Sequence, residues 1–401
     1  MFGGATGYFV AGSSGITGIQ TSGAPASLIG IGGNANHDTM DTSGKAVGLW
    51  PDGPCVSYKG GDGNNYAIFP HSENFRMTVA DWESGASWTG LTNCYNSPRT
   101  AGEGQYANRI WIFGTYATGN TVYALGHMEW YQTRTTGDTD VDWGALDGWN
   151  GYAPAQRQVM SPTWLKSTDN GATWAIKTTG GDRPVLKPEP WATQSRDTYY
   201  GFRHPSNIMH EGGYYYAFLD FISLPGSTDL LDQGFCMVRT NDLESSTNWE
   251  YYNGSGWTAN NRASYQGNLA AQQPHQFFGT SGWDPYTESP PTCRMAQALC
   301  WHVPTQQWLL FGFRSDVAGY FCFTRSATLA DPQFESNGST IISLGSGDSA
   351  NNYIGARYIS VFDDAATDQN LREIGNNPIC VTTLADRTGF EYNRLTISVS
   401  A

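Results

Sequence analysis

The stretch Asn120–Trp130 reads N-T-V-Y-A-L-G-H-M-E-W and contains the structural unit that this chain repeats. Its first part alternates in the way that is typical of a half-buried strand. The stretch then ends in His127 and Glu129, which lie two positions apart. Because side chains two positions apart point to the same face of a strand, the stretch predicts a strand that presents two ionisable groups together.

Similar strands recur along the chain, and each ends in a different reactive group. The further copies are Tyr66–Glu73 with His71 and Glu73, Tyr216–Asp220, and Trp308–Arg314. Units of this kind leave a face unburied when alone, and they bury one another when they stack around an axis. The sequence therefore predicts an all-β fold, a single five-bladed β-propeller over residues 50–401. A sixth blade is expected if residues 1–49, rich in Gly, Ser and Thr, add one rather than lead into the propeller.

Composition narrows the possible partners and the location. The chain has 401 residues, of which 14% are charged, and its net charge of −14 argues against nucleic acids and anionic membranes. No apolar run approaches the roughly 20 residues that span a bilayer. Few charges and many Gly, Ser, Thr and Asn residues favour a secreted or extracellular protein. Met1–Val10 lacks the features of a signal peptide, so we expect none in this chain. The oligomeric state stays open between a monomer and an unknown oligomer.

The seven cysteines predict no metal site. Cys55, Cys300 and Cys322 fall in strand-like runs, where a buried free thiol is the usual state. Cys293 and Cys300 could form a disulfide, although the connectivity of cysteines cannot be read from sequence. None of the cysteines has the spacing of a zinc site, and we expect no cofactor. A structural calcium ion is possible but no residue pattern indicates it.

The segment Ser167–Trp174 has the pattern S-x-D-x-G-x-T-W and resembles the Asp box of sialidases and other β-propellers. Its physical basis is a tight turn, in which Asp169 accepts backbone N–H bonds, Gly171 takes a positive φ and Trp174 packs beneath. We assign it a structural role and no catalysis.

The geometry of a blade brings the candidate site residues to one rim. In such a blade the starts of first strands and the ends of second strands share one face, and the short turns between them lie on the other. The candidates at the shared face are Asp52, Glu129, Glu73 and Asp220 for catalysis, and His71, His127, Trp130, Arg203, His204, Arg314 and Asp38 for substrate binding. Long aromatic insertions fall on the same face, which marks it as the functional one.

Four segments carry a resemblance to a known group of enzymes: Trp50–Pro54, His127–Glu129, Phe202–Asn207 and Gly213–Tyr216. The chain resembles the five-bladed propeller glycosidases, the arabinanase, β-xylosidase and invertase/levanase group. The resemblance implies that Asp52 is the base or nucleophile, that Glu129 or Glu73 is the acid, and that Asp220 orients the site. The sequence departs from that group at Arg203-His204-Pro205, where an Arg-Asp-Pro site usually carries the orienting carboxylate.

The expected function is therefore glycoside hydrolysis of a poly- or oligosaccharide, which needs one protonated and one ionised carboxyl group beside the scissile bond. One alternative is a propeller polysaccharide lyase acting on uronic acids, with a histidine base, a tyrosine acid and Arg203 or Arg314 on the uronate. A sialidase with an arginine cluster that includes Arg76 is a weaker alternative. A third class is a non-catalytic carbohydrate-binding propeller of a phage or cell-surface protein.

Overall fold

The computed structural model describes fifteen parts of the chain. They are residues 15–21, 26–30, 51–70, 73–97, 109–133, 156–177, 185, 199–222, 233–245, 248–259, 293–314, 320–334, 339–343, 358–383 and 389–400. These parts are built from strands, and the one helical element among them is the short 3-10 turn Gly85–Ser87. No helix in the described residues is long and apolar enough to cross a membrane. The expectation of an all-β fold is confirmed.

The strands form five groups, in which most neighbours in sequence pair antiparallel. Group 1 is β3 (Val56–Lys59), β4 (Asn65–Phe69), β5 (Glu73–Val79) and β6 (Trp88–Asn96). Group 2 is β7 (Ile110–Thr118), β8 (Thr121–Thr133), β9 (Gln156–Ser167) and β10 (Ala175–Ile176). Group 3 is β11 (Tyr199–Arg203), β12 (Met209–Glu211), β13 (Tyr214–Ile222), β14 (Gln233–Thr240), β15 (Trp249–Tyr252) and β16 (Trp257–Ala259). Group 4 is β17 (Cys293–His302), β18 (Gln307–Arg314), β19 (Tyr320–Ser326) and β20 (Ser339–Ser343), with β22 (Glu373–Ile374) on its inner edge. Group 5 is β21 (Tyr358–Phe362), β23 (Ile379–Thr383), β24 (Gly389–Val399), β1 (Ile16–Thr21) and β2 (Ala26–Gly30).

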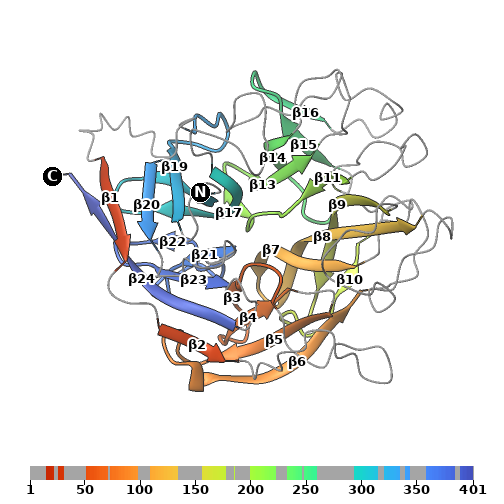
Figure 1. Cartoon of the computed structure of the whole chain (residues 1–401), viewed down its shortest axis with the longest axis horizontal. Coiled ribbons are helices and arrows are strands. Elements are labelled where there is room, and N and C mark those ends of the chain that lie inside the picture. Colours follow the sequence, from red (N-terminus) through yellow and green to blue (C-terminus); the bar gives the residue numbers. More distant parts are fainter. Residues whose placement is uncertain are drawn as a thin grey trace, which may run out of the picture.

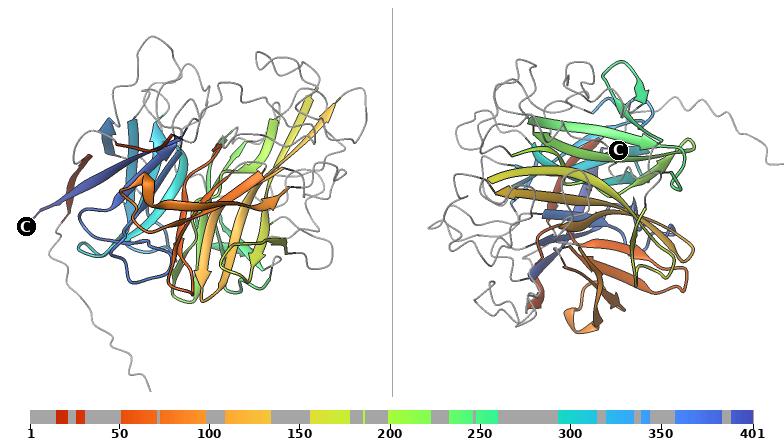
Figure 2. Two further views of the ribbon diagram at one scale, coloured as in Figure 1. Left: turned by 90° about the horizontal axis from the view of Figure 1, so that it is seen from below. Right: turned by 90° about the vertical axis from the view of Figure 1, so that its right-hand side faces the viewer.

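The five groups close into a ring around one axis, which is viewed end-on in Figure 1. Strand β3 contacts β7, β9 pairs in parallel with β11, β13 contacts β17, β17 contacts β21, and β21 returns to β3. The fold is a β-propeller, and Figure 2 shows it from two sides. The number of blades stays a prediction, and the five groups of strands support the count of five.

The ring is closed by strands from both ends of the chain. Strands β1 and β2 fall within the segment 1–49, and both pair antiparallel with β24. Figure 1 shows these red strands beside the blue C-terminal strand. The sequence did not predict these two strands, because short Gly- and Thr-rich stretches carry little hydrophobic signal.

Alternation along each strand builds the core between neighbouring groups. In β8, Val122 and Ala124 pack in the cluster shared with group 1, whereas Tyr123 and Leu125 pack in the cluster shared with group 3. His127 and Glu129 are odd-numbered in the same strand, so they belong to the face toward group 3.

The two rims of the ring differ as the sequence predicts. At the first rim, called the site rim, the amide of Asp52 donates to Pro70, the amide of Glu129 donates to Arg109, and Arg203 pairs in register with Asp220. The opposite rim, called the turn rim, holds the hairpin turns at Gly60–Asn64 and Gly119–Asn120. Between Val122 and Glu129 the strand β8 rises about 23 Å, so the two rims are well separated.

The Ser167–Trp174 segment forms a hydrogen-bonded turn at the turn rim. Asp169 accepts bonds from the Thr173 amide at 2.9 Å and from its hydroxyl at 2.6 Å. Gly171 has a φ of 76°, and Trp174 is buried against group 1. Because Ser167 pairs with Val122 at the start of β8, this turn lies far from Glu129.

The possible disulfide between Cys293 and Cys300 is excluded. Cys293 and Cys300 lie in the same strand, about 20 Å apart, and a disulfide needs Cα atoms within about 7 Å. Cys300 is a free, buried thiol.

Glu73 does not end a second strand. Strand β4 ends at Phe69, and Glu73 begins β5, because Pro70 has no amide to donate to a ladder. Phe75, Met77 and Val79 of β5 pack toward group 5, and the period of two puts Glu73 on their face. The two His-x-Glu copies are therefore not equivalent in the fold.

Candidate active site

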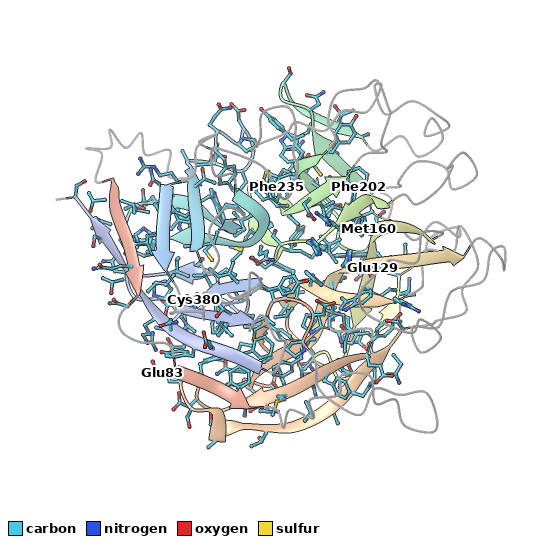
Figure 3. The ribbon with its side chains drawn as sticks, in the orientation of Figure 1. Glu83, Glu129, Met160, Phe202, Phe235 and Cys380 are labelled. Carbon is cyan, nitrogen blue, oxygen red and sulfur yellow. The ribbon has the colours of Figure 1, made fainter. Side chains whose placement is uncertain are left out.

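Strand β8 holds Glu129 by means of a buried histidine. The Nε2 atom of His127 lies 2.9 Å from Oε1 of Glu129, and the His127 residue is 3% exposed. Gly126 precedes this pair because a Cβ there would lie 2.4 Å from Cγ2 of Ile110. Glu129 itself is only partly buried. Figure 3 shows it on β8 near Met160, its partner in register on β9.

Group 3 supplies a buried ion pair. Nε of Arg203 donates to Oδ2 of Asp220 at 2.6 Å, and both side chains are almost completely buried. Burial alone would raise the pKa of Asp220, but the charges of Arg203 and His204 outweigh it and hold the pKa below its usual range. Asp220 is therefore an ionised carboxylate at neutral pH.

His204 follows β11 and binds the same carboxylate. Its Nδ1 lies 3.1 Å from Oδ1 and 3.2 Å from Oδ2 of Asp220, and the hydrogen-bond geometry favours Oδ2. Burial lowers the pKa of His204 below its usual value, and this effect is larger than the opposing effect of Asp220. The imidazole is therefore neutral at pH 7, with Nδ1–H donating to the carboxylate.

Asp52 comes from group 1 and is bound by group 5. The hydroxyl of Tyr358, the first residue of β21, donates to Oδ1 of Asp52 at 3.2 Å. Tyr358 also packs with Trp111 and Phe113 of β7. This contact joins the first, second and fifth groups at the axis.

Phe113 of β7 lies between the rings of His127, His204 and Tyr358. Its ring centroid lies 5.6 Å from those of both His127 and His204, and 5.8 Å from that of Tyr358. The rings of His127 and His204 are 4.8 Å apart. We call this set the central cluster; it consists of Asp52, Phe113, His127, Glu129, Arg203, His204, Asp220 and Tyr358.

The central cluster has an acidic character. It contains three carboxylates and one guanidinium, which leave a formal charge of −2 when both imidazoles are neutral. Arg203 is already paired with Asp220, so its charge is largely compensated. No group of three His, Cys, Asp or Glu side chains within the described residues has the arrangement of a metal site.

The cluster contains six of the residues singled out in the sequence: Asp52, His127, Glu129, Arg203, His204 and Asp220. Glu73 is buried on the face of group 1 that packs toward group 5 and is not part of the cluster. His71 and Asp38 lie outside the described residues, as do the side chains of Trp130 and Arg314, although Arg314 does end β18. Arg76, which the sialidase alternative placed in its arginine cluster, lies away from the site, because it donates to the Asn170 carbonyl in the turn at the opposite rim.

Sequence reasoning missed Tyr358 and Phe113. Tyr358 could have been found from its position, because it is the first residue of β21, the first strand of group 5. Asp52 and Arg203 also lie at ends of the first strands of their groups, before β3 and at the end of β11. Phe113 gives no such signal, since its role depends on contacts with residues from three other groups.

Comparisons with known proteins come from structure alone. No known protein family matches the sequence, and no curated protein does. The chain is similar to the catalytic domain of the GH62 α-L-arabinofuranosidase of Coprinopsis cinerea, with 12% identity, a TM-score of 0.48, and coverage of 97% of this chain and 99% of that one. It is also similar to a family 117 glycoside hydrolase of the marine bacterium Zobellia galactanivorans, with 9% identity, a TM-score of 0.49, and coverage of 93% and 90%.

A third similar structure is a PL25 ulvan lyase, with 11% identity, a TM-score of 0.40, and coverage of 85% of this chain and 64% of that one. The first two proteins are glycoside hydrolases, the class that the sequence resembles. At these identities and TM-scores the similarity says nothing about the chemistry of this chain, which has to be argued from its own residues.

Proposed function

We propose that the protein is a glycoside hydrolase that cleaves a poly- or oligosaccharide at the site rim, outside the cell. The observation that carries the proposal is that Asp52 and Glu129, from different groups of strands, belong to one cluster. Asp52 is held by Tyr358, Tyr358 packs on Phe113, and Phe113 packs on the histidine that binds Glu129. Glycoside hydrolysis requires two carboxyl groups beside the scissile bond, and Asp52 and Glu129 are the candidates for them.

Each carboxyl group has a role in this proposal. Glu129 donates its proton to the leaving glycosidic oxygen, and Asp52 takes a proton from the attacking water or attacks the anomeric carbon itself. We favour the first role for Asp52, which inverts the anomeric configuration, because the two residues come from separate groups with Phe113 between their supports. A separation of about 6.5–9.5 Å between the carboxyl groups is typical of inversion.

The charge of the cluster favours a neutral glycan. With Glu129 protonated as the acid, a uronate would still meet two carboxylates, Asp52 and Asp220, and a guanidinium that is already paired, and like charges at close range repel. Neutral sugars carry hydroxyl groups, which both donate to carboxylates and accept from Arg203.

The test is incubation of the protein with neutral plant, algal and bacterial glycans, followed by measurement of reducing ends and of the anomer released. On a glycan that is cleaved, Glu129→Gln and Asp52→Asn should each lower kcat by at least about a hundredfold, the scale of general acid–base catalysis. Glu250→Gln and Asp62→Asn are matched controls, because Glu250 is paired with Arg239 on β14 and Asp62 lies in the Gly60–Asn64 turn. Full activity of Glu129→Gln on a substrate with a poor leaving group would disprove its role as the acid.

A lyase is the second candidate, and one observation favours it. His204 is neutral, oriented by Asp220, and 6.1 Å from the ring of Tyr358, so a base and a tyrosine acid are neighbours. The same panel should include uronate-containing glycans, with absorbance of unsaturated products as the readout. One unsaturated product for each new reducing end would replace the hydrolase by the lyase, because β-elimination leaves the glycosidic oxygen on the anomeric carbon and so releases a reducing end as well. Binding to a glycan without any cleavage would leave a carbohydrate-binding propeller.

A further inference from the structure

The two nitrogens of His204 have different surroundings. Nδ1 is bound to Asp220, whereas no described residue bonds to Nε2. The Nε2 atom is also not among the fully buried polar atoms without a partner. With the proton fixed on Nδ1, Nε2 carries a lone pair that is open to a ligand.

His127 differs in this respect, although the two rings are neighbours. Its Nε2 is engaged by Glu129, and its Nδ1 is fully buried without a partner in the described part of the chain. His127 therefore supports Glu129, while His204 has the nitrogen that a substrate can reach.

The backbone of His204 is strained in support of this arrangement. Its φ is 45°, a conformation that non-glycine residues seldom adopt. Pro205 follows, and a proline disfavours helical conformations of the residue before it. Strain of this kind persists when the surrounding structure fixes it, and it is concentrated at functional sites.

We propose that His204 contacts the substrate through Nε2 by accepting a hydrogen bond from a sugar hydroxyl, and that Asp220 acts through His204 as a positioning residue. The inference rests on the proposed function, because it takes a glycan to be the ligand of the central cluster. Nε of Arg203 and Nδ1 of His204 both bond to Oδ2 of Asp220, and Oδ1 is fully buried, so the carboxylate itself is directed at these two residues. Asp220 therefore acts on the substrate through the imidazole of His204, whose orientation and protonated nitrogen it fixes.

The first experiment needs no substrate. In the ¹⁵N-labelled protein at neutral pH, nitrogen chemical shifts of His204 should show a protonated Nδ1 and an unprotonated Nε2. The signals are assigned by their loss in His204→Asn, since asparagine tolerates a positive φ. A proton on Nε2 would overturn the inference and leave the two-carboxylate hydrolase intact.

The second experiment measures KM and kcat on the glycan that the panel identifies. His204→Asn should raise KM at least tenfold, while the thermal midpoint stays within a few degrees of that of the unchanged protein. His210→Asn is the matched control: His210 is an exposed histidine of β12, packed against the ring of Tyr215 at the turn rim, and its loss should change neither constant. An unchanged KM in His204→Asn would overturn the inference.

The role of Asp220 is tested by a double-mutant cycle. If Asp220 acts through His204, then Asp220→Asn should add little to the loss already caused by His204→Asn, because the two changes interrupt the same contact. Additive losses would assign Asp220 a separate role. If Asp220→Asn fails to fold, the KM of His204→Asn alone decides. If the panel gives binding without cleavage, the dissociation constant replaces KM, and a panel without binding or cleavage would overturn both proposals.

Discussion

At the scale of the residue, the site is built from buried groups whose charge states depend on one another. Burial lowers the pKa of His204, and the Arg203 guanidinium with His204 lowers that of Asp220 against the effect of burial. In both cases the unfolded chain binds protons at a higher pH than the folded chain does. The free energy of unfolding should therefore fall as the pH falls, below the ordinary 6.5 for His204 and below the ordinary 3.8 for Asp220.

This dependence can be measured between pH 7 and pH 5 by urea unfolding. The unchanged protein should lose stability over this range, and His204→Asn should show a flatter profile because its side chain does not titrate. The matched control is His210→Asn, which removes an exposed histidine outside the central cluster. Identical slopes for all three proteins would mean that His204 does not set the profile.

At the scale of the element, the turn that follows the third strand of a group docks on the preceding group. The turn after β5 places Trp82 against Phe362 of group 5, and the turn after β9 accepts a bond from Tyr58 of group 1. The turn after β14 bonds group 2 through Glu244 and Lys166. After β19, three donors of the turn bond Glu211 of group 3, namely the Thr328 hydroxyl and the amides of Leu329 and Ala330.

Glu211 offers a direct test of this docking. It also accepts from Nε1 of Trp308 at 2.6 Å, so Glu211→Ala removes the acceptor of four donors, of which the Ala330 amide alone keeps a second acceptor, the Thr328 hydroxyl. We expect a loss of about 2–4 kcal/mol in the free energy of unfolding, because unsatisfied donors in partly buried positions are costly. Glu250→Ala removes only one partly exposed ion pair, with Arg239, and should cost about 1 kcal/mol or less. Equal losses in urea unfolding would contradict the docking role.

At the scale of the whole molecule, the sequence predicted what local pattern determines. The alternation of apolar and polar residues predicted the strands. The starts of first strands and the ends of second strands share one rim of a propeller, and this rule predicted that Asp52, Glu129 and Asp220 lie at the same rim. Contacts across the ring carry no local pattern, so the roles of Phe113 and Tyr358 were not predicted. Glu73 was misplaced because Pro70 ends β4 before it, and a repeated motif was taken for a repeated position.

The closure of the ring was also missed, and it supports the last prediction. Ile19 of β1 is 5% exposed and packs with Leu395 and Ile397 of β24 in the core between groups 4 and 5. If β1 is an integral strand of the propeller, Ile19→Ala should cost about 2–4 kcal/mol, the usual range for a buried isoleucine. Thr17→Ala is the matched control on the same strand, because Thr17 is exposed and its hydroxyl bonds only the Ser398 carbonyl. Its cost should stay near 0.5 kcal/mol. The free energies of unfolding of both variants are measured by thermal and urea unfolding. A cost for Ile19→Ala as small as that for Thr17→Ala would mean that the ring is stable without its N-terminal strand.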